Sequence, residues 1–290
     1  MGTALALLTS CGGGGGEGGG RARAALAPPT PVRWIAAGDS YSSGAGVAGV
    51  PEPCREGEDA MAPRARALLA GDLEIDEFVH VACADAEIDQ VLEQVRETSA
   101  EHPDERFNLV TLTVGGNDIG FAEVVADCLG EDDLRDRVTP GKHAGCDLTE
   151  GELVARVDSL RSRLVPLYQR ILDQLAPGGA LVVVGYPNLM SDPDEWDDDT
   201  CLGVSTSDAA MLRRVAAELD SRIAAAADEA GAVYLSVIDA FDGHEVCGSD
   251  DRWMNGISLR RGASFHPSVE GHHAEGTLLA IALRELYAVS

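Results

Sequence analysis

The sequence predicts an α/β fold, in which a mainly parallel sheet of five strands lies between two layers of helices as a three-layer α/β/α sandwich. Five short apolar runs, each bounded by turn residues, have the length and composition of buried strands. Longer segments with apolar residues at three- and four-residue spacing separate these runs, as amphipathic helices do. This alternation is typical of a parallel sheet covered by helices on both faces.

The expected strands are short, rich in β-branched residues and apolar on both faces. They are Val32–Ala37, Phe78–Ala82, Leu109–Val114, Ala180–Gly185 and Val233–Ile238. Since ligands of parallel sheets bind beyond the carboxyl ends of the strands, functional residues are expected directly after these runs.

The expected helices occupy the intervals between the strands and the C-terminal end of the chain. They are Asp59–Ala70, Glu87–Ser99, Glu152–Leu175, Ser207–Ala230 and Val269–Tyr287. Gly231 follows the fourth helix and suits a helix C-cap. Two segments interrupt the alternation and are expected to be loops, Cys128–Cys146 and Pro187–Cys201.

The first 31 residues have the composition of an export signal and a linker, so we place a single folded domain at residues 32–290. Leu8-Thr9-Ser10-Cys11 resembles a bacterial lipobox, in which the cysteine is lipidated, and residues 1–11 are interpreted as a lipoprotein-type signal segment. Residues 12–31 form a Gly/Pro-rich linker. An apolar N-terminus without a signal function, followed by low complexity, is the alternative. Export predicts an extracellular or cell-surface location, with membrane anchoring through Cys11.

The charge and the cysteines limit the possible partners. The formal net charge of -27 argues against nucleic acid, because binding phosphates needs a basic face. Six cysteines follow Cys11, and an even number in an exported chain suggests disulfides. No CxxC occurs and no histidine lies at a zinc-like spacing from these cysteines, so we expect no metal. No later segment reaches the roughly 18 to 20 apolar residues that span a bilayer.

Three short polar motifs lie where the fold places a site. Gly38-Asp39-Ser40 follows the first expected strand, Gly115-Gly116-Asn117-Asp118 follows the third, and Phe265-His266-Pro267 precedes the last helix. A serine needs a base to act as a nucleophile at neutral pH, and His266 could supply it. The backbone N–H groups and the Asn117 amide could stabilise an oxyanion. Ser40 could otherwise be only a helix N-cap, and Asp39 is expected to stabilise the turn.

With these motifs the sequence resembles the SGNH, or GDSL-type, serine hydrolases, and among them the secreted actinobacterial esterases and lipases. The resemblance covers the chain from about Val32 to its end. Its motifs are GDSYSSG from Gly38, ACADA from Ala82, TVGGNDIGF from Thr113, FDGHEVCGSDDRWMN from Phe241, and SFHP from Ser264. It implies the flavodoxin-like SGNH hydrolase fold and a reaction that needs no cofactor.

The resemblance also implies a role for each motif. Ser40 would be the nucleophile and His266 the general base. The oxyanion hole would consist of the N–H groups of Ser40 and Asp85 and the side chain of Asn117. Disulfides would join successive cysteines, as Cys54–Cys83, Cys128–Cys146 and Cys201–Cys247.

Two positions depart from the family pattern. Asp85 stands where the family usually has glycine, which keeps the backbone N–H but not glycine's conformational freedom. Ala263 stands where many members have the acid that orients the histidine. We therefore expect a Ser–His dyad in which the main-chain carbonyl of Ser264 orients His266. A more distant acid is the alternative, and the candidates are Asp239, Asp242 and Asp251.

The leading functional hypothesis is a monomeric serine esterase or lipase that hydrolyses small-molecule or lipid esters through an acyl-enzyme. A carbohydrate deacetylase or a lysophospholipase could use the same residues, and a non-catalytic surface binding protein could keep the fold. An apolar acyl groove would indicate lipid substrates, whereas exposed aromatic residues would indicate sugars. His272 and His273, near the start of the last helix, are expected to be ordinary helix residues.

Overall fold

The computed structural model describes residues 31–103, 105–121, 123–124, 146, 148–196, 200–201, 204–248, 251–258 and 262–288. The signal segment with Cys11, the linker up to residue 30, and Cys128 lie outside the described residues. Within the described part of the chain, no helix is both long and apolar enough to cross a membrane.

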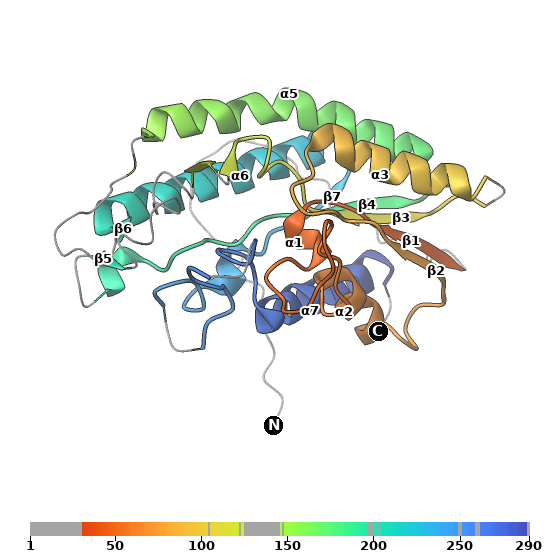
Figure 1. Ribbon diagram of the computed structural model, residues 1–290. Coiled ribbons are helices and arrows are strands. Elements are labelled where there is room, and N and C mark those ends of the chain that lie inside the picture. The colour runs from red at the N-terminus through yellow and green to blue at the C-terminus, as the bar shows by residue number, and fades with distance from the viewer. Residues whose placement is uncertain are drawn as a thin grey trace, which may run out of the picture.

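The central sheet has five parallel strands, as predicted (Figure 1). Its order is β2-β1-β3-β4-β7, with β1 at Val32–Ala36, β2 at Ile75–His80, β3 at Leu109–Leu112, β4 at Ala180–Val184 and β7 at Val233–Leu235. A separate antiparallel pair joins β5 (Thr200–Cys201) to β6 (Val204–Ser205). The β2 strand begins earlier than expected, because an edge strand can carry charged residues on its half-buried surface.

Helices cover both faces of the sheet, which confirms the three-layer α/β/α sandwich (Figure 1). One layer consists of α3 (Ile88–Glu101), α5 (Glu150–Gln174) and α6 (Thr206–Ala230). The other consists of α2 (Met61–Leu68) and α7 (Val269–Leu286). Successive residues of β1 enter different cores, because strand side chains alternate: Ile35 packs under the first layer and Trp34 against the second.

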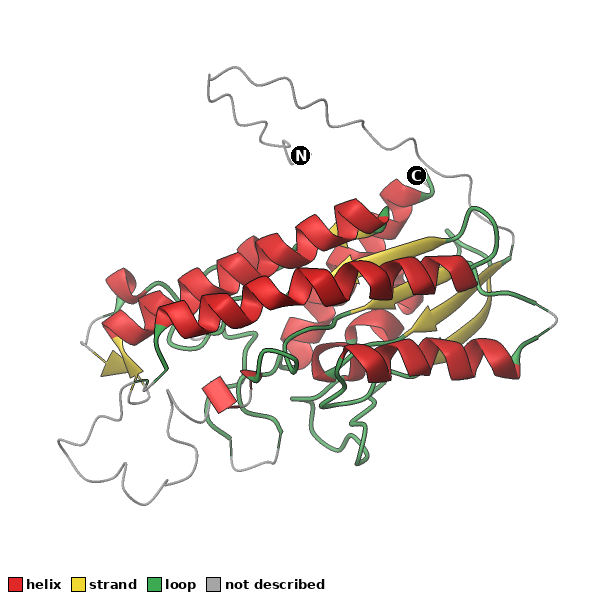
Figure 2. Cartoon of the chain, turned by 90° about the horizontal axis from the view of Figure 1, so that it is seen from above, coloured by secondary structure: helices red, strands yellow, loops and turns green. Residues whose placement is uncertain are grey.

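The two longest helices, α5 and α6, lie side by side and extend past the sheet on the side of the strand carboxyl ends (Figures 1 and 2). A capping box at Thr149 and Glu152 begins α5. Three ion pairs join the two helices along their exposed sides, and they are Arg214–Glu150, Arg222–Asp158 and Arg161–Glu229. The helices therefore form an extended wall beside the carboxyl edge of the sheet.

Two of the three expected disulfides are present in the described residues. Cys54 is bonded to Cys83, and Cys201 to Cys247. The third expected pair includes Cys128, so it stays a prediction. The Cys54–Cys83 bond is reinforced by a hydrogen bond of 2.9 Å from Ala84 N–H to the Cys54 carbonyl. It joins the loop that follows α1 (Ser40–Ser43) to the loop that follows β2.

Replacing both Cys54 and Cys83 by serine should lower the free energy of unfolding by about 3 to 4 kcal/mol. The bond spans 29 residues, and closing a loop of that length restricts the unfolded chain by roughly this amount. Urea unfolding followed by circular dichroism would measure it against the wild-type protein. A loss of less than about 1 kcal/mol would show that the bond does not constrain the unfolded chain as expected.

Candidate active site

The first strand ends in a tight turn that places Ser40 at the carboxyl edge of the sheet. Gly38 has φ +124°, and a Cβ there would lie 2.7 Å from the carbonyl oxygen of Thr113, so this position needs glycine. Asp39 is the N-cap of α1, and its Oδ1 accepts a hydrogen bond of 3.1 Å from Tyr41 N–H. Gly44, with φ +107°, ends the helix. Ser40 is thus the first residue of a one-turn helix held at both ends.

The carboxylate of Asp39 links this turn to two other strands. It is 1% exposed. Thr113 Oγ1, after β3, donates to Oδ1 at 2.6 Å, and the hydroxyl of Tyr186, after β4, donates to Oδ2. The Tyr186 oxygen in turn accepts from Gly116 N–H at 3.1 Å. Burial raises the pKa of Asp39, and its hydrogen bonds to Thr113, Tyr186 and Tyr41 act in the opposite direction. The position suits the turn-stabilising role expected for Asp39.

The structure brings His266 to Ser40 with the ring oriented for proton transfer. Nε2 lies 2.9 Å from Ser40 Oγ, and Nδ1 lies 2.8 Å from the Ser264 carbonyl oxygen. A carbonyl can only accept a hydrogen bond, so Nδ1 carries the hydrogen. Nε2 then has a free electron pair, and the Ser40 hydroxyl donates to it. This is the tautomer that a general base requires.

The three acids considered as alternatives do not provide the partner of His266 Nδ1. The side chains of Asp242 and Asp251 are 62% and 76% exposed, and they lie next to Arg213 and His244. Asp239 lies in the short 3₁₀ helix η4 (Ile238–Phe241). The partner of Nδ1 in the structure is the Ser264 carbonyl oxygen.

A strained turn holds the histidine in place. Phe265 has φ +56°, in the left-handed region that a bulky residue rarely adopts. Asn255 holds this turn on both sides, because its carbonyl accepts from Phe265 N–H at 3.0 Å and its N–H donates to the His266 carbonyl at 2.9 Å. The Tyr41 hydroxyl donates to the Phe265 carbonyl at 2.6 Å, and its ring lies 5.1 Å from the imidazole.

The environment of His266 keeps the imidazole neutral. Burial is the largest cause and lowers its pKa to about 4, and electrostatic interactions with His272 and with the Arg55 guanidinium act in the same direction. The hydrogen bond to the Ser264 carbonyl and the charge of Asp85 oppose the shift. The ring is therefore unprotonated, and able to accept a proton, at neutral pH.

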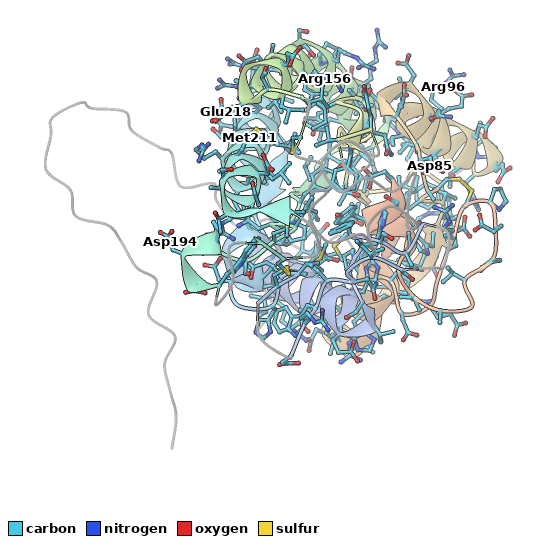
Figure 3. The ribbon with its side chains drawn as sticks, turned by 60° about the vertical axis from the view of Figure 1, so that its left-hand side comes forward. Asp85, Arg96, Arg156, Asp194, Met211 and Glu218 are labelled. Carbon is cyan, nitrogen blue, oxygen red and sulfur yellow. A yellow bond between two sulfur atoms is a disulfide. The ribbon has the colours of Figure 1, made fainter. Side chains whose placement is uncertain are left out.

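The residues expected at the oxyanion hole lie on neighbouring loops. Asp85 has φ +65°, so it adopts the left-handed conformation for which glycine is usually selected, and aspartate is one of the residues that tolerates it best. Its side chain is exposed, and Figure 3 labels it on the loop beside α1. The Asn117 side chain donates to the Ala86 carbonyl at 2.9 Å, and Cys83 N–H donates to the Gly38 carbonyl at 3.0 Å. These bonds connect the loops of Ser40, Asp85 and Asn117.

An apolar cavity opens beside Ser40 and Asn117 and extends between α5 and α6. Its walls are mostly aliphatic and aromatic side chains, among them Phe121, Leu153, Leu212, Val215, Ala216 and Leu219. Tyr186 also lines the cavity, and its hydroxyl donates to Asp39. The space next to the serine hydroxyl is therefore lined mainly by apolar groups.

Several residues of the site were not identified from the sequence. Tyr186 joins Asp39 to Gly116, and Asn255 holds the turn before His266, through hydrogen bonds that leave no repeating pattern in the sequence. His244 belongs to the family motif that begins at Phe241. Its ring stacks on that of Trp253, with the ring centroids 3.8 Å apart, and supports the loop that precedes Asn255. Among the residues that the structure describes, no group of three or more His, Cys, Asp or Glu side chains could hold a metal ion.

Comparison with known proteins agrees with this geometry. The model of the GDSL-like Lipase/Acylhydrolase family matches residues 36–274. The chain is 29% identical to Lipase 1 of Streptomyces coelicolor and 28% identical to a lipase of Streptomyces rimosus, each match covering 82% of this chain and 81% of the relative.

Solved structures show the same fold. A crystal structure of an extracellular lipase from Streptomyces rimosus aligns with a TM-score of 0.67 at 26% identity, over 87% of this chain and 99% of that one. Phospholipase A1 from Streptomyces albidoflavus aligns with a TM-score of 0.65, also at 26% identity and with the same coverage. The chain belongs to the GDSL-like lipase/acylhydrolase family and is a carboxylic ester hydrolase.

Proposed function

We propose that this hydrolase cleaves esters by a two-step mechanism with Ser40 as the nucleophile and His266 as the general base. The observation that carries the proposal is the 2.9 Å contact between Ser40 Oγ and His266 Nε2, with Nδ1 bonded to the Ser264 carbonyl. His266 takes the hydroxyl proton as Ser40 attacks the ester carbonyl, and then gives it to the departing alcohol. Water, activated by His266, hydrolyses the acyl-enzyme and restores the serine.

The negative charge that develops on the ester oxygen needs donors that are already in place. We assign this role to the backbone N–H groups of Ser40 and Asp85 and to the Asn117 amide. Asn117 is held by its bond to the Ala86 carbonyl, and its backbone neighbour Gly116 is held by Tyr186. The exposed carboxylate of Asp85 points to solvent, so only its N–H need face the oxyanion.

The apolar cavity favours substrates with a hydrocarbon acyl chain over acetylated sugars. Most of the described residues that line it are apolar, and it begins at the nucleophile. Two similar proteins are named lipases and one solved structure is a phospholipase A1, which agrees with a lipid ester. We therefore place lipase or phospholipid-directed action ahead of carbohydrate deacetylation.

We also infer that the protein acts outside the cell. The two described disulfides are stable in an oxidising compartment, and the similar Streptomyces rimosus structure is that of an extracellular lipase. Anchoring through a lipidated Cys11 is the more specific form of this proposal, and mass spectrometry of the protein from its native membrane fraction would test it.

Ser40→Ala should lower kcat/KM on p-nitrophenyl butyrate by about 10³-fold or more, because it removes the nucleophile. The variant should fold normally, since the Ser40 side chain contributes only its hydroxyl. Melting temperature and circular dichroism would verify folding, and a fluorophosphonate should label the wild-type protein at Ser40. Activity that survives the substitution, or an unlabelled Ser40 in folded protein, would favour a non-catalytic binding protein.

The acid limb of kcat/KM should lie near pH 4, below the ordinary imidazole value of 6.5, since burial lowers the pKa of His266 to about 4. Activity should be nearly constant from about pH 5 to about pH 8. Because the unfolded chain binds this proton more tightly, the folded state is destabilised as pH falls from 6.5 toward 4. Initial rates should therefore be taken after a rapid pH change. An acid limb centred near 6.5 would contradict the effect of burial.

Ala216→Phe should shift the preference toward short acyl chains, because the larger ring fills the cavity between α5 and α6. The ratio of kcat/KM for p-nitrophenyl laurate to that for the butyrate should fall about 10-fold. Ala217→Phe is the matched control, since Ala217 is exposed on the next position of α6 and does not line the cavity. If the ratio of kcat/KM for laurate to that for butyrate is the same in both variants, the acyl chain does not bind in this cavity.

A further inference from the structure

A buried imidazole and a buried carboxyl group lie on α7, outside the residues assigned to the reaction. His272 is 0% exposed and Glu275 is 2% exposed, and the two residues are one helical turn apart. Burying such groups costs free energy unless they interact with specific partners. Their contacts lead to the turn that carries Ser40.

His272 is bonded to the backbone directly after α1. Its Nε2 lies 3.1 Å from the Ala45 carbonyl oxygen, and since a carbonyl only accepts, Nε2 carries the hydrogen. The N–H of Ala45 donates to the Ser40 carbonyl at 3.2 Å, and Gly44 N–H donates to the same oxygen. A short chain of hydrogen bonds therefore connects His272 to the peptide group of the nucleophile.

Glu275 faces the other nitrogen of the ring. Its Oε2 lies 3.4 Å from His272 Nδ1, and neither atom has a hydrogen-bond partner elsewhere among the described residues. Burial raises the pKa of Glu275, while the contact with His272 opposes that shift. Nε2 of His272 already carries a hydrogen. One further proton can lie between Nδ1 and the Glu275 carboxyl group, and in either place it leaves the Nε2 hydrogen facing the Ala45 carbonyl.

The surroundings fix this pair in place. A Cβ on Gly276 would lie 2.7 Å from Arg64 Cβ and 2.8 Å from the Met61 carbonyl, so α7 is packed closely against α2. His80, on β2, also contacts α1, since its Nε2 lies 3.0 Å from the Ser42 carbonyl oxygen. Besides these, the charged and titratable groups that interact with the pair are Asp39, Tyr41 and His266.

We propose that Glu275 and His272 are positioning residues for the nucleophile. Glu275 holds the hydrogen on Nε2 of His272, His272 holds the Ala45 carbonyl, and Ala45 fixes the Ser40 peptide group. The pair thereby sets the direction of the Ser40 hydroxyl toward His266 and of the Ser40 N–H toward the oxyanion. This inference rests on the proposed role of Ser40 as the nucleophile.

Glu275→Leu tests the proposal, because leucine fills similar space but leaves Nδ1 without a partner, so only the Ala45 carbonyl still favours the hydrogen on Nε2. We expect kcat on p-nitrophenyl butyrate to fall about 10-fold, with KM within about twofold of the wild-type value. The rate of fluorophosphonate labelling at Ser40 should fall by the same factor. Glu275→Gln should recover most of both rates, because its amide can donate to Nδ1 and leave the hydrogen on Nε2.

Glu285→Leu is the matched control, since Glu285 is exposed on the same helix and contacts none of these groups. Wild-type kcat and labelling in Glu275→Leu, or a glutamine variant no faster than the leucine variant, would overturn the proposal. If Glu275→Leu does not fold, His272→Phe replaces it and should show the same loss of kcat. Unchanged rates there would also overturn the proposal. Failure of the wild-type protein to label at Ser40 would instead contradict the proposed function.

Discussion

The buried carboxylate of Asp39 is the interaction on which the rest of the site depends. It accepts hydrogen bonds from its own turn, from Thr113 after β3 and from Tyr186 after β4, so one side chain fixes the carboxyl ends of three neighbouring strands. A buried carboxylate needs such partners, and removing one of them would cost about 1 to 3 kcal/mol. Their geometry determines where Ser40 begins its helix and where the Gly116–Asn117 turn lies relative to it.

The regular strands of the sheet could be predicted from the sequence, whereas the contacts of individual side chains could not. The five strands have the regular apolar pattern of a buried parallel sheet, and they occur where expected. Their ends are less regular: β7 stops at Leu235 because the chain turns into a 3₁₀ helix from Ile238. Ser40 and Asn117 were expected at the carboxyl edge because each directly follows an expected strand, whereas His266 was identified by its motif before the last helix. Tyr186, Asn255 and Glu275 could not be found this way, because their roles depend on individual hydrogen bonds and contacts.

Asp85 shows how a departure from the family pattern can be accommodated. The family glycine is expected where the backbone enters the left-handed region, and Asp85 enters it with φ +65°. Aspartate tolerates this conformation better than most residues, and the exposed carboxylate needs no buried partner. The change leaves a negative charge near His266, which raises the pKa of this imidazole against the larger effect of burial. The substitution therefore affects the electrostatics of the site more than its backbone.

In the proposed mechanism His266 removes the serine proton, although its low pKa makes the resting imidazole a weak base. At the resting value of about 4 the imidazolium is poorly stabilised, because the ring is buried and its Nδ1 partner is a neutral carbonyl. The tetrahedral intermediate changes this balance, since it places a negative oxygen near the ring. Two unit charges about 4 Å apart interact by about 4 kcal/mol at an effective dielectric constant of about 20. That corresponds to about three pKa units. The pKa of the imidazole would thus rise from about 4 to near neutral pH as the oxyanion forms. Under the proposed mechanism, burial of Ser40 and His266 thus penalises the charged pair before the reaction and strengthens its attraction in the transition state, which is the differential stabilisation that catalysis requires.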